Sequence, residues 1–177
     1  MSTKRSPNPL AGYPITLVEQ IQHLIASDQF AAVFLQRYPH AHSVRTDTAL
    51  YAYVQGLKSI YLKNSGPLNK VAFDSTLQVV RNALGTHSRS TRIQGAKLSS
   101  RREIRIATVF KLMPPEFLRM IVVHELAHIK ENNHDKAFYQ LCRHMEPDYH
   151  QLEFDLRACL CYLDAGGTPL WPAASAS

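Results

Sequence analysis

The chain has 177 residues, of which 45% are hydrophobic and 19% charged. This composition supports a buried core of ordinary domain size and excludes a wholly disordered chain. No apolar run approaches the roughly 20 residues that span a bilayer, and no apolar stretch typical of a secretory signal follows the first basic residues. The cysteines are odd in number and lack CxxC spacing, so we expect a cytoplasmic protein with reduced thiols, packed as small core residues: Cys142, Cys159 and Cys161.

The positive charge is concentrated in the first part of the chain. The net charge is 20 − 14 = +6; residues 1–105 hold 14 Lys/Arg and 5 Asp/Glu, whereas residues 106–177 hold 6 and 9. A basic segment of this kind attracts phosphates or nucleic acid, and ordinary solubility is the alternative.

The N-terminal part reads as helical. Apolar residues at helical spacing predict a helix over residues 15–38, with a break at Ser27 and Asp28, and a second helix over residues 46–62. Asn-Ser-Gly-Pro at 64–67 is a strong helix breaker and our candidate boundary. We therefore expect an N-terminal arm with helices over 1–65 and a second domain over 66–177.

Short strands are predicted next. Val71–Phe73 is strand-like, and residues 77–80 fit either a strand or a helix. Thr91–Gln94 and Glu103–Val109 are stronger strand candidates, and residues 96–101 would form the turn of an antiparallel hairpin. The sequence therefore predicts an α+β fold with a small antiparallel sheet.

A buried helix follows the strands. Pro-Pro-Glu at 114–116 is a favourable helix opening, and the residues after it are apolar nearly all round, as in a central helix. Asn132 and Asn133 are expected to end it. Two further helices are predicted over residues 135–145 and 147–163.

This helix contains the motif His124-Glu125-Leu126-Ala127-His128. Residues four apart share a helix face, so both imidazoles can bind one ion, and neutral imidazole is a good Zn²⁺ ligand. Glu125 lies beside them, where it can take a proton from an activated water. The alternative is a pair of hydrogen-bonded core histidines, which would be costly to bury without a partner.

Catalytic zinc usually has three protein ligands. His134 follows His128 with five residues between, the His-to-His gap of the HExxHxxGxxH pattern, although the glycine of that pattern is missing. We favour His134 as the third ligand. Glu153 is the alternative, with His134 then an ordinary loop residue.

The stretch from Arg105 to about Tyr162 resembles the YgjP-like family of zinc metallopeptidase domains. The resemblance rests on Met-Pro-Pro-Glu leading into Val-Val-His-Glu-Leu-Ala-His, then Asn-His-Asp-Lys-Ala-Phe-Tyr and Met-Glu-Pro-Asp-Tyr. It implies a zincin-like fold, one Zn²⁺ per chain held by His124, His128 and His134, and Glu125 as the catalytic residue.

Other residues are weaker candidates. The segment Arg89–Arg105 could hold a phosphate, a carboxylate or a nucleic-acid backbone, or be a solvated hairpin face; its basic residues are Arg89, Arg92, Lys97, Arg101, Arg102 and Arg105. Three residues could stabilise an oxyanion but are more often packing or surface residues: Tyr139, Tyr149 and His150. Asp135 is expected to cap the next helix rather than orient His134, and His144 to lie on a helix surface.

These observations predict a zinc-dependent hydrolase, with a metallopeptidase as the main expectation. The first alternative is a metal-dependent hydrolase of nucleotide phosphoanhydrides, because the basic segment suits phosphate and the activated water would be the same. The second is a nucleic-acid-associated binding protein or protease. The expected partners are accordingly a peptide, a protein or a phosphorylated small molecule, with nucleic acid bound through Arg89–Arg105.

Overall fold

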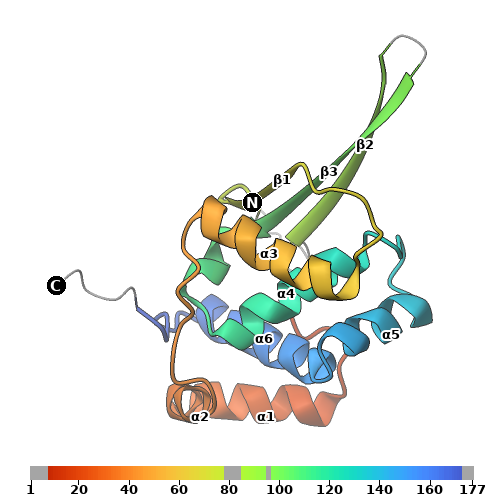
Figure 1. The fold of residues 1–177 in the computed structure, drawn as a ribbon. Coiled ribbons are helices and arrows are strands. Elements are labelled where there is room, and N and C mark those ends of the chain that lie inside the picture. Colours follow the sequence, from red (N-terminus) through yellow and green to blue (C-terminus); the bar gives the residue numbers. More distant parts are fainter. Residues whose placement is uncertain (1–7, 78–84, 95–96, 173–177) are drawn as a thin grey trace, which may run out of the picture.

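The computed structural model describes residues 8–77, 85–94 and 97–172, and for 85–94 and 97–101 it describes the backbone alone. The described chain is a mostly helical α+β structure in which a sheet lies on one side of the central helix and further helices on the other (Figure 1). The elements, in chain order, are α1 Ile15–Ala26, α2 Phe30–Arg37, α3 Asp47–Tyr61, β1 Lys70–Asp74, β2 Gly85–Gln94, β3 Lys97–Ala107, the 3-10 helix η2 Thr108–Leu112, α4 Pro115–Ala127, α5 Lys136–Met145 and α6 Tyr149–Asp164.

The N-terminal helices agree with the sequence pattern. The predicted break falls between α1 and α2, where Asp28 adopts a left-handed conformation with φ of 57°. Thr46 caps α3, because its hydroxyl accepts a hydrogen bond from the Ala49 amide at 3.1 Å. The expected helices over 15–38 and 46–62 are therefore confirmed.

The sheet has three described strands in the order β1-β3-β2. β2 and β3 form the expected antiparallel hairpin, but β1 pairs parallel to β3, with Val71 opposite Ile104. The expectation of an antiparallel sheet was therefore wrong for β1. A hairpin is encoded by neighbouring residues, whereas the direction of β1 depends on a pairing across more than 30 residues of chain.

The hairpin is also longer than predicted. β3 begins at Lys97, and Gln94 pairs with Lys97, so residues 97–101 belong to a strand and not to the expected turn. Only the base of β3, from Glu103 to Ala107, also pairs with β1. The rest of the hairpin extends away from the helices (Figure 1). Residues 78–80, which fitted a strand or a helix, lie outside the described residues.

α4 is the central element, as its apolar sequence predicts. Its buried residues are Phe117, Leu118, Met120, Ile121, Val122, Val123, Glu125, Leu126 and Ala127. The helix ends at Ala127, earlier than the expected end at Asn132 and Asn133. The Ile129 and Lys130 amides donate to carbonyls three residues earlier, at 3.1 Å each, so the chain tightens out of the α-helix here.

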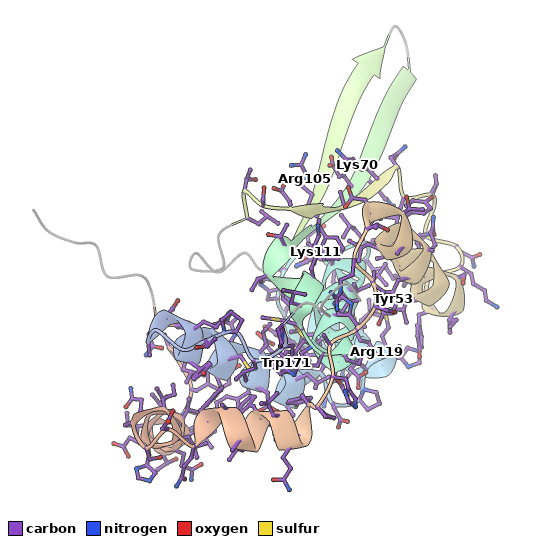
Figure 2. All side chains as sticks on the ribbon, turned by 90° about the vertical axis from the view of Figure 1, so that its left-hand side faces the viewer. Tyr53, Lys70, Arg105, Lys111, Arg119 and Trp171 are labelled. Carbon is purple, nitrogen blue, oxygen red and sulfur yellow. The ribbon has the colours of Figure 1, made fainter. Side chains whose placement is uncertain are left out.

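Charged contacts join α4 to its neighbours. Arg119 of α4 donates to the Glu146 carboxylate and to the Met145 carbonyl, both at 2.7 Å, which ties α4 to the end of α5. Arg119 also lies near Tyr53 of α3 (Figure 2). These contacts hold α3 and the end of α5 against α4.

The N-terminal helices pack against α6 and share one hydrophobic core with the rest of the described chain. Phe30 stacks on Tyr162, with ring centroids 4.7 Å apart. The Tyr38 hydroxyl donates to Asp155 at 2.5 Å, and the Trp171 indole donates to the Tyr38 carbonyl at 2.7 Å. The division at residue 65 stays a prediction. Among the described residues, no helix has both the length and the apolar character needed to cross a membrane.

Candidate metal centre

Three histidines converge beside the end of α4. The Nε2 atom of His134 lies 3.2 Å from that of His124 and 2.9 Å from that of His128. Within the described residues, these three side chains form a group whose ligand atoms all lie within 4.8 Å of one another, so they can hold a metal ion. His134, six positions after His128, thus lies beside the two histidines of the HExxH motif.

Hydrogen bonds at Nδ1, the ring nitrogen that faces away from the cluster, orient the imidazoles of His124 and His128. His124 Nδ1 lies 2.6 Å from the Tyr149 hydroxyl, and His128 Nδ1 lies 3.0 Å from the Glu131 carbonyl. A carbonyl can only accept, so Nδ1 of His128 carries the proton and its Nε2 lone pair is free. This is the arrangement found where a histidine ligates a metal.

Phe138 forms the floor of the histidine cluster. It is fully buried, and its ring centroid lies 5.0, 4.6 and 4.8 Å from those of His124, His128 and His134. The sequence analysis did not single out this residue. Its apolar side chain in the first turn of the next helix, four residues after His134, is the one signal that points to it.

The N-terminus of α5 positions His134. Asp135 accepts a hydrogen bond from the Phe138 amide at 3.0 Å, which caps α5 and confirms the expected capping role. His134 therefore lies directly before the capping residue of α5, which fixes the backbone at this point. Its side chain is exposed, while those of His124 and His128 are half-buried, so the cluster opens to solvent on the His134 side.

The electrostatics keep the two helix histidines neutral. Burial, followed by the nearby His128 and His134 rings, lowers the pKa of His124 to about 3. Burial also lowers the pKa of His128, against the opposing effect of the Glu131 carbonyl. A neutral imidazole keeps a lone pair that it can offer to a metal cation.

The observed nitrogen positions fit a metal ion. Nitrogens held at the usual Zn–N distance in a tetrahedron lie about 3.3 Å from one another, and the His134 separations of 3.2 and 2.9 Å are close to this value. The donor set of three imidazoles suits several transition metals, zinc among them.

Glu125 is buried and unpaired. It is 1% exposed, and neither carboxylate oxygen has a hydrogen-bond partner among the described residues. Burial raises its pKa to about 8. A carboxyl group left without a partner in the interior is costly to the fold, which is typical of residues retained for chemistry.

The other candidates occupy different positions. Glu153 lies outside the histidine group and pairs with Arg157 at 3.2 Å. Tyr149 is buried against His124, whereas the Tyr139 ring is half-buried at 6.5 Å from His134, and His150 is exposed.

Two predictions about single residues are confirmed. His144 lies on the surface, and Cys142 and Cys159 are buried free thiols. The third cysteine differs from the prediction, because Cys161 is half-buried and packs against the edge of the core. The side chains of Arg89, Arg92, Lys97 and Arg101 lie outside the described part of the chain, so nucleic-acid binding through this segment stays a prediction.

Comparison with known proteins extends the resemblance seen in the sequence. The model of the YgjP-like family, described as a YgjP-like metallopeptidase domain, matches residues 57–158. The chain belongs to the YgjP-like family. It is also 54% identical over 157 residues to a UTP pyrophosphatase of Escherichia coli (strain K12), covering 89% of this chain and 94% of that protein. No solved structure matches the chain significantly.

This relative corrects the main functional expectation. We expected a metallopeptidase, but the curated relative that aligns along nearly its whole length is named for an activity on a nucleotide. The alternative, hydrolysis of a nucleotide phosphoanhydride, is better supported. HExxH motifs predict a metal and a proton acceptor, and neither feature specifies whether a carbonyl or a phosphorus is attacked.

Proposed function

We propose that this protein is a metal-dependent hydrolase of nucleoside triphosphates that converts UTP and water to UMP and pyrophosphate. In this reaction the water oxygen forms a bond to the α-phosphorus, the α–β phosphoanhydride bond breaks, and pyrophosphate leaves. The observation that carries the proposal is the 54% identity to a UTP pyrophosphatase along 94% of that protein. The alignment leaves out only 20 of the 177 residues, so it includes the segment that carries the histidine cluster.

The three histidines are proposed to hold the metal. His124 and His128 are neutral, and hydrogen bonds at their Nδ1 atoms orient both rings. His134, in the loop before α5, completes the group. When bound, a divalent cation supplies Lewis-acid chemistry, neutralising phosphate charge and acidifying water. We propose zinc as the cation, because imidazole nitrogen is one of its preferred ligands.

Glu125 is proposed as the general base. It follows His124 on α4, turned from it by about 100° around the helix axis. Its carboxylate has no hydrogen-bond partner among the described residues, so its oxygens are free to take a proton. It would take the proton of the attacking water.

The test is a substrate assay with a matched pair of variants. Zinc-loaded protein is incubated with UTP, CTP, ATP and GTP, and pyrophosphate and nucleoside monophosphate are quantified. We expect Glu125→Gln to retain zinc and to lose about 100-fold or more in kcat. Glu116→Gln, an exposed change in the first turn of the same helix, should keep full activity. Absence of pyrophosphate release from UTP by the wild type would overturn the proposal.

Two broader expectations accompany this function. We infer a zincin-like fold from the position of the histidine cluster on a central helix that packs against β2 and β3. We infer a cytoplasmic location from the three free cysteines, because extracellular proteins of this size tend to oxidise theirs.

A further inference from the structure

Among the described residues, the Tyr149 hydroxyl is the one side-chain group that is hydrogen-bonded to Nδ1 of His124. The two atoms lie 2.6 Å apart, and the residues are 25 positions apart in the chain. Tyr149 is fully buried, and its ring lies nearly parallel to the imidazole, at an angle of 18°. The contact is therefore a defined interaction inside the protein and not a surface encounter.

The direction of this hydrogen bond follows from the rest of the cluster. If the Nε2 lone pair of His124 faces a metal, Nδ1 must carry the proton. The Tyr149 oxygen then accepts a hydrogen bond from Nδ1–H, and its own O–H is left to donate elsewhere. A buried hydroxyl without an acceptor would be costly, so an acceptor is required behind the tyrosine.

Glu153 provides that acceptor. Burial, followed by the nearby Glu153 carboxylate, raises the pKa of the Tyr149 phenol. Cys142 is a second neighbour of this hydroxyl, but a carboxylate is a much stronger acceptor than a thiol. Glu153 is one helix turn from Tyr149 on α6, a spacing that places both on one face.

Arg157 fixes the position of Glu153. Its Nε and Nη2 atoms donate to Glu153 Oε1 at 3.3 and 3.2 Å, and its Nη1 donates to the Pro9 carbonyl at 3.3 Å. Arg157 thereby connects the segment before α1 to Glu153, on the same helix as Tyr149. These contacts give the N-terminal arm a structural link to the candidate centre.

We propose that Tyr149 is a positioning residue: its oxygen accepts a hydrogen bond from Nδ1–H of His124 and its O–H is directed at Glu153, which fixes the ring and tautomer of His124. The inference rests on the proposed role of the histidines as metal ligands. It also gives Glu153, the alternative third ligand, a different role: supporting Tyr149, which orients His124. Partners of this kind change metal affinity by about 10- to 100-fold when removed.

The test measures zinc affinity of the full-length protein without any nucleotide. Metal-free protein competes with a chromophoric chelator for added Zn²⁺, and Co²⁺ substitution reports the ligand field by visible absorption. We expect Tyr149→Phe to weaken zinc binding about 10- to 100-fold and to shift the Co²⁺ bands. Tyr162→Phe removes a hydroxyl from the same helix, and it should leave both readouts unchanged.

A second variant covers the case in which Tyr149→Phe fails to fold. Glu153→Gln keeps the side-chain shape but removes the charge, and we expect a several-fold loss of zinc affinity. Unchanged affinity in folded Tyr149→Phe, an equal loss in Tyr162→Phe, or unchanged affinity in Glu153→Gln would overturn the inference. Wild-type protein that binds no zinc would overturn the proposed metal site as well. Failure of UTP hydrolysis with intact zinc binding would leave the Tyr149 assignment standing.

Discussion

The Nε2 atom of His134 lies 2.9 Å from that of His128, although His134 is exposed and belongs to the loop before α5. This contact depends on two helix ends. α4 tightens and ends after Ala127, and Asp135 caps the start of α5. The short segment between them turns the chain so that a surface histidine meets a pair held on the buried helix.

The first prediction concerns the third ligand. His134→Ala should reduce zinc affinity by more than about 100-fold, because a direct ligand contributes more than the residues that orient ligands. Zinc content after dialysis, measured by elemental analysis, checks this. His23→Ala, at an exposed position on α1, is the control and should bind one zinc per chain. Full zinc content in His134→Ala would exclude His134 as a ligand.

The second prediction concerns the contact between α2 and α6. Tyr38→Phe removes the donor to Asp155, a carboxylate that is 3% exposed and also contacts Arg37 at 3.2 Å. We expect the free energy of unfolding to fall by about 1–3 kcal/mol, because a buried acceptor loses a partner. Urea unfolding measures it. An exposed hydroxyl serves as control, and Tyr51→Phe should change stability by less than about 0.5 kcal/mol.

The third prediction concerns the C-terminal segment, where Trp171 is 6% exposed and its ring lies edge-on to that of Phe117, with centroids 6.0 Å apart. Trp171→Ala should cost about 3–5 kcal/mol, since it removes a large buried ring. Trp171→Phe keeps an aromatic ring and loses the hydrogen bond to the Tyr38 carbonyl, so a smaller cost of about 1 kcal/mol is expected from that bond. Equal stability of the two variants would show that packing at this site matters little.

The fourth prediction is a pH dependence of stability through His42. The Val44 amide donates to His42 Nδ1 at 3.0 Å, and the Nε2 proton is directed at the Phe110 carbonyl, 2.6 Å away. Burial lowers the pKa of His42 from 6.5. The unfolded chain therefore takes up this proton at a higher pH than the folded protein does, so stability should fall as the pH drops below about 6.5.

Urea unfolding of metal-free protein between pH 7.5 and 5 measures this dependence. His42→Gln lacks the titrating ring, so its stability should fall less steeply over the same interval, whatever its stability at pH 7.5. The other histidines are present in both proteins, and the difference between the slopes therefore isolates His42. Identical slopes would show that His42 does not titrate differently on folding.

Much of the fold was predictable because the signals are local. The break at Asp28, the cap at Thr46 and the cap at Asp135 each depend on residues a few positions apart. The errors occurred where pairing is not local. The parallel direction of β1 and the length of the hairpin are decided by strand partners, and a turn of polar residues resembles a polar strand in the sequence.

The candidate site, too, has features that local sequence spacing predicts and features that depend on how distant segments pack. The spacing of His124 and His128 matches the helix period and is enough to place both on one helix face, and the apolar residues around them indicate that this helix is buried. The positions of Tyr149 and Phe138 against the histidine cluster, and of Glu153 near Tyr149, are visible only in the folded structure. Those contacts depend on how α5 and α6 pack against α4, which is governed by the shape of the whole core and not by the spacing of any short motif.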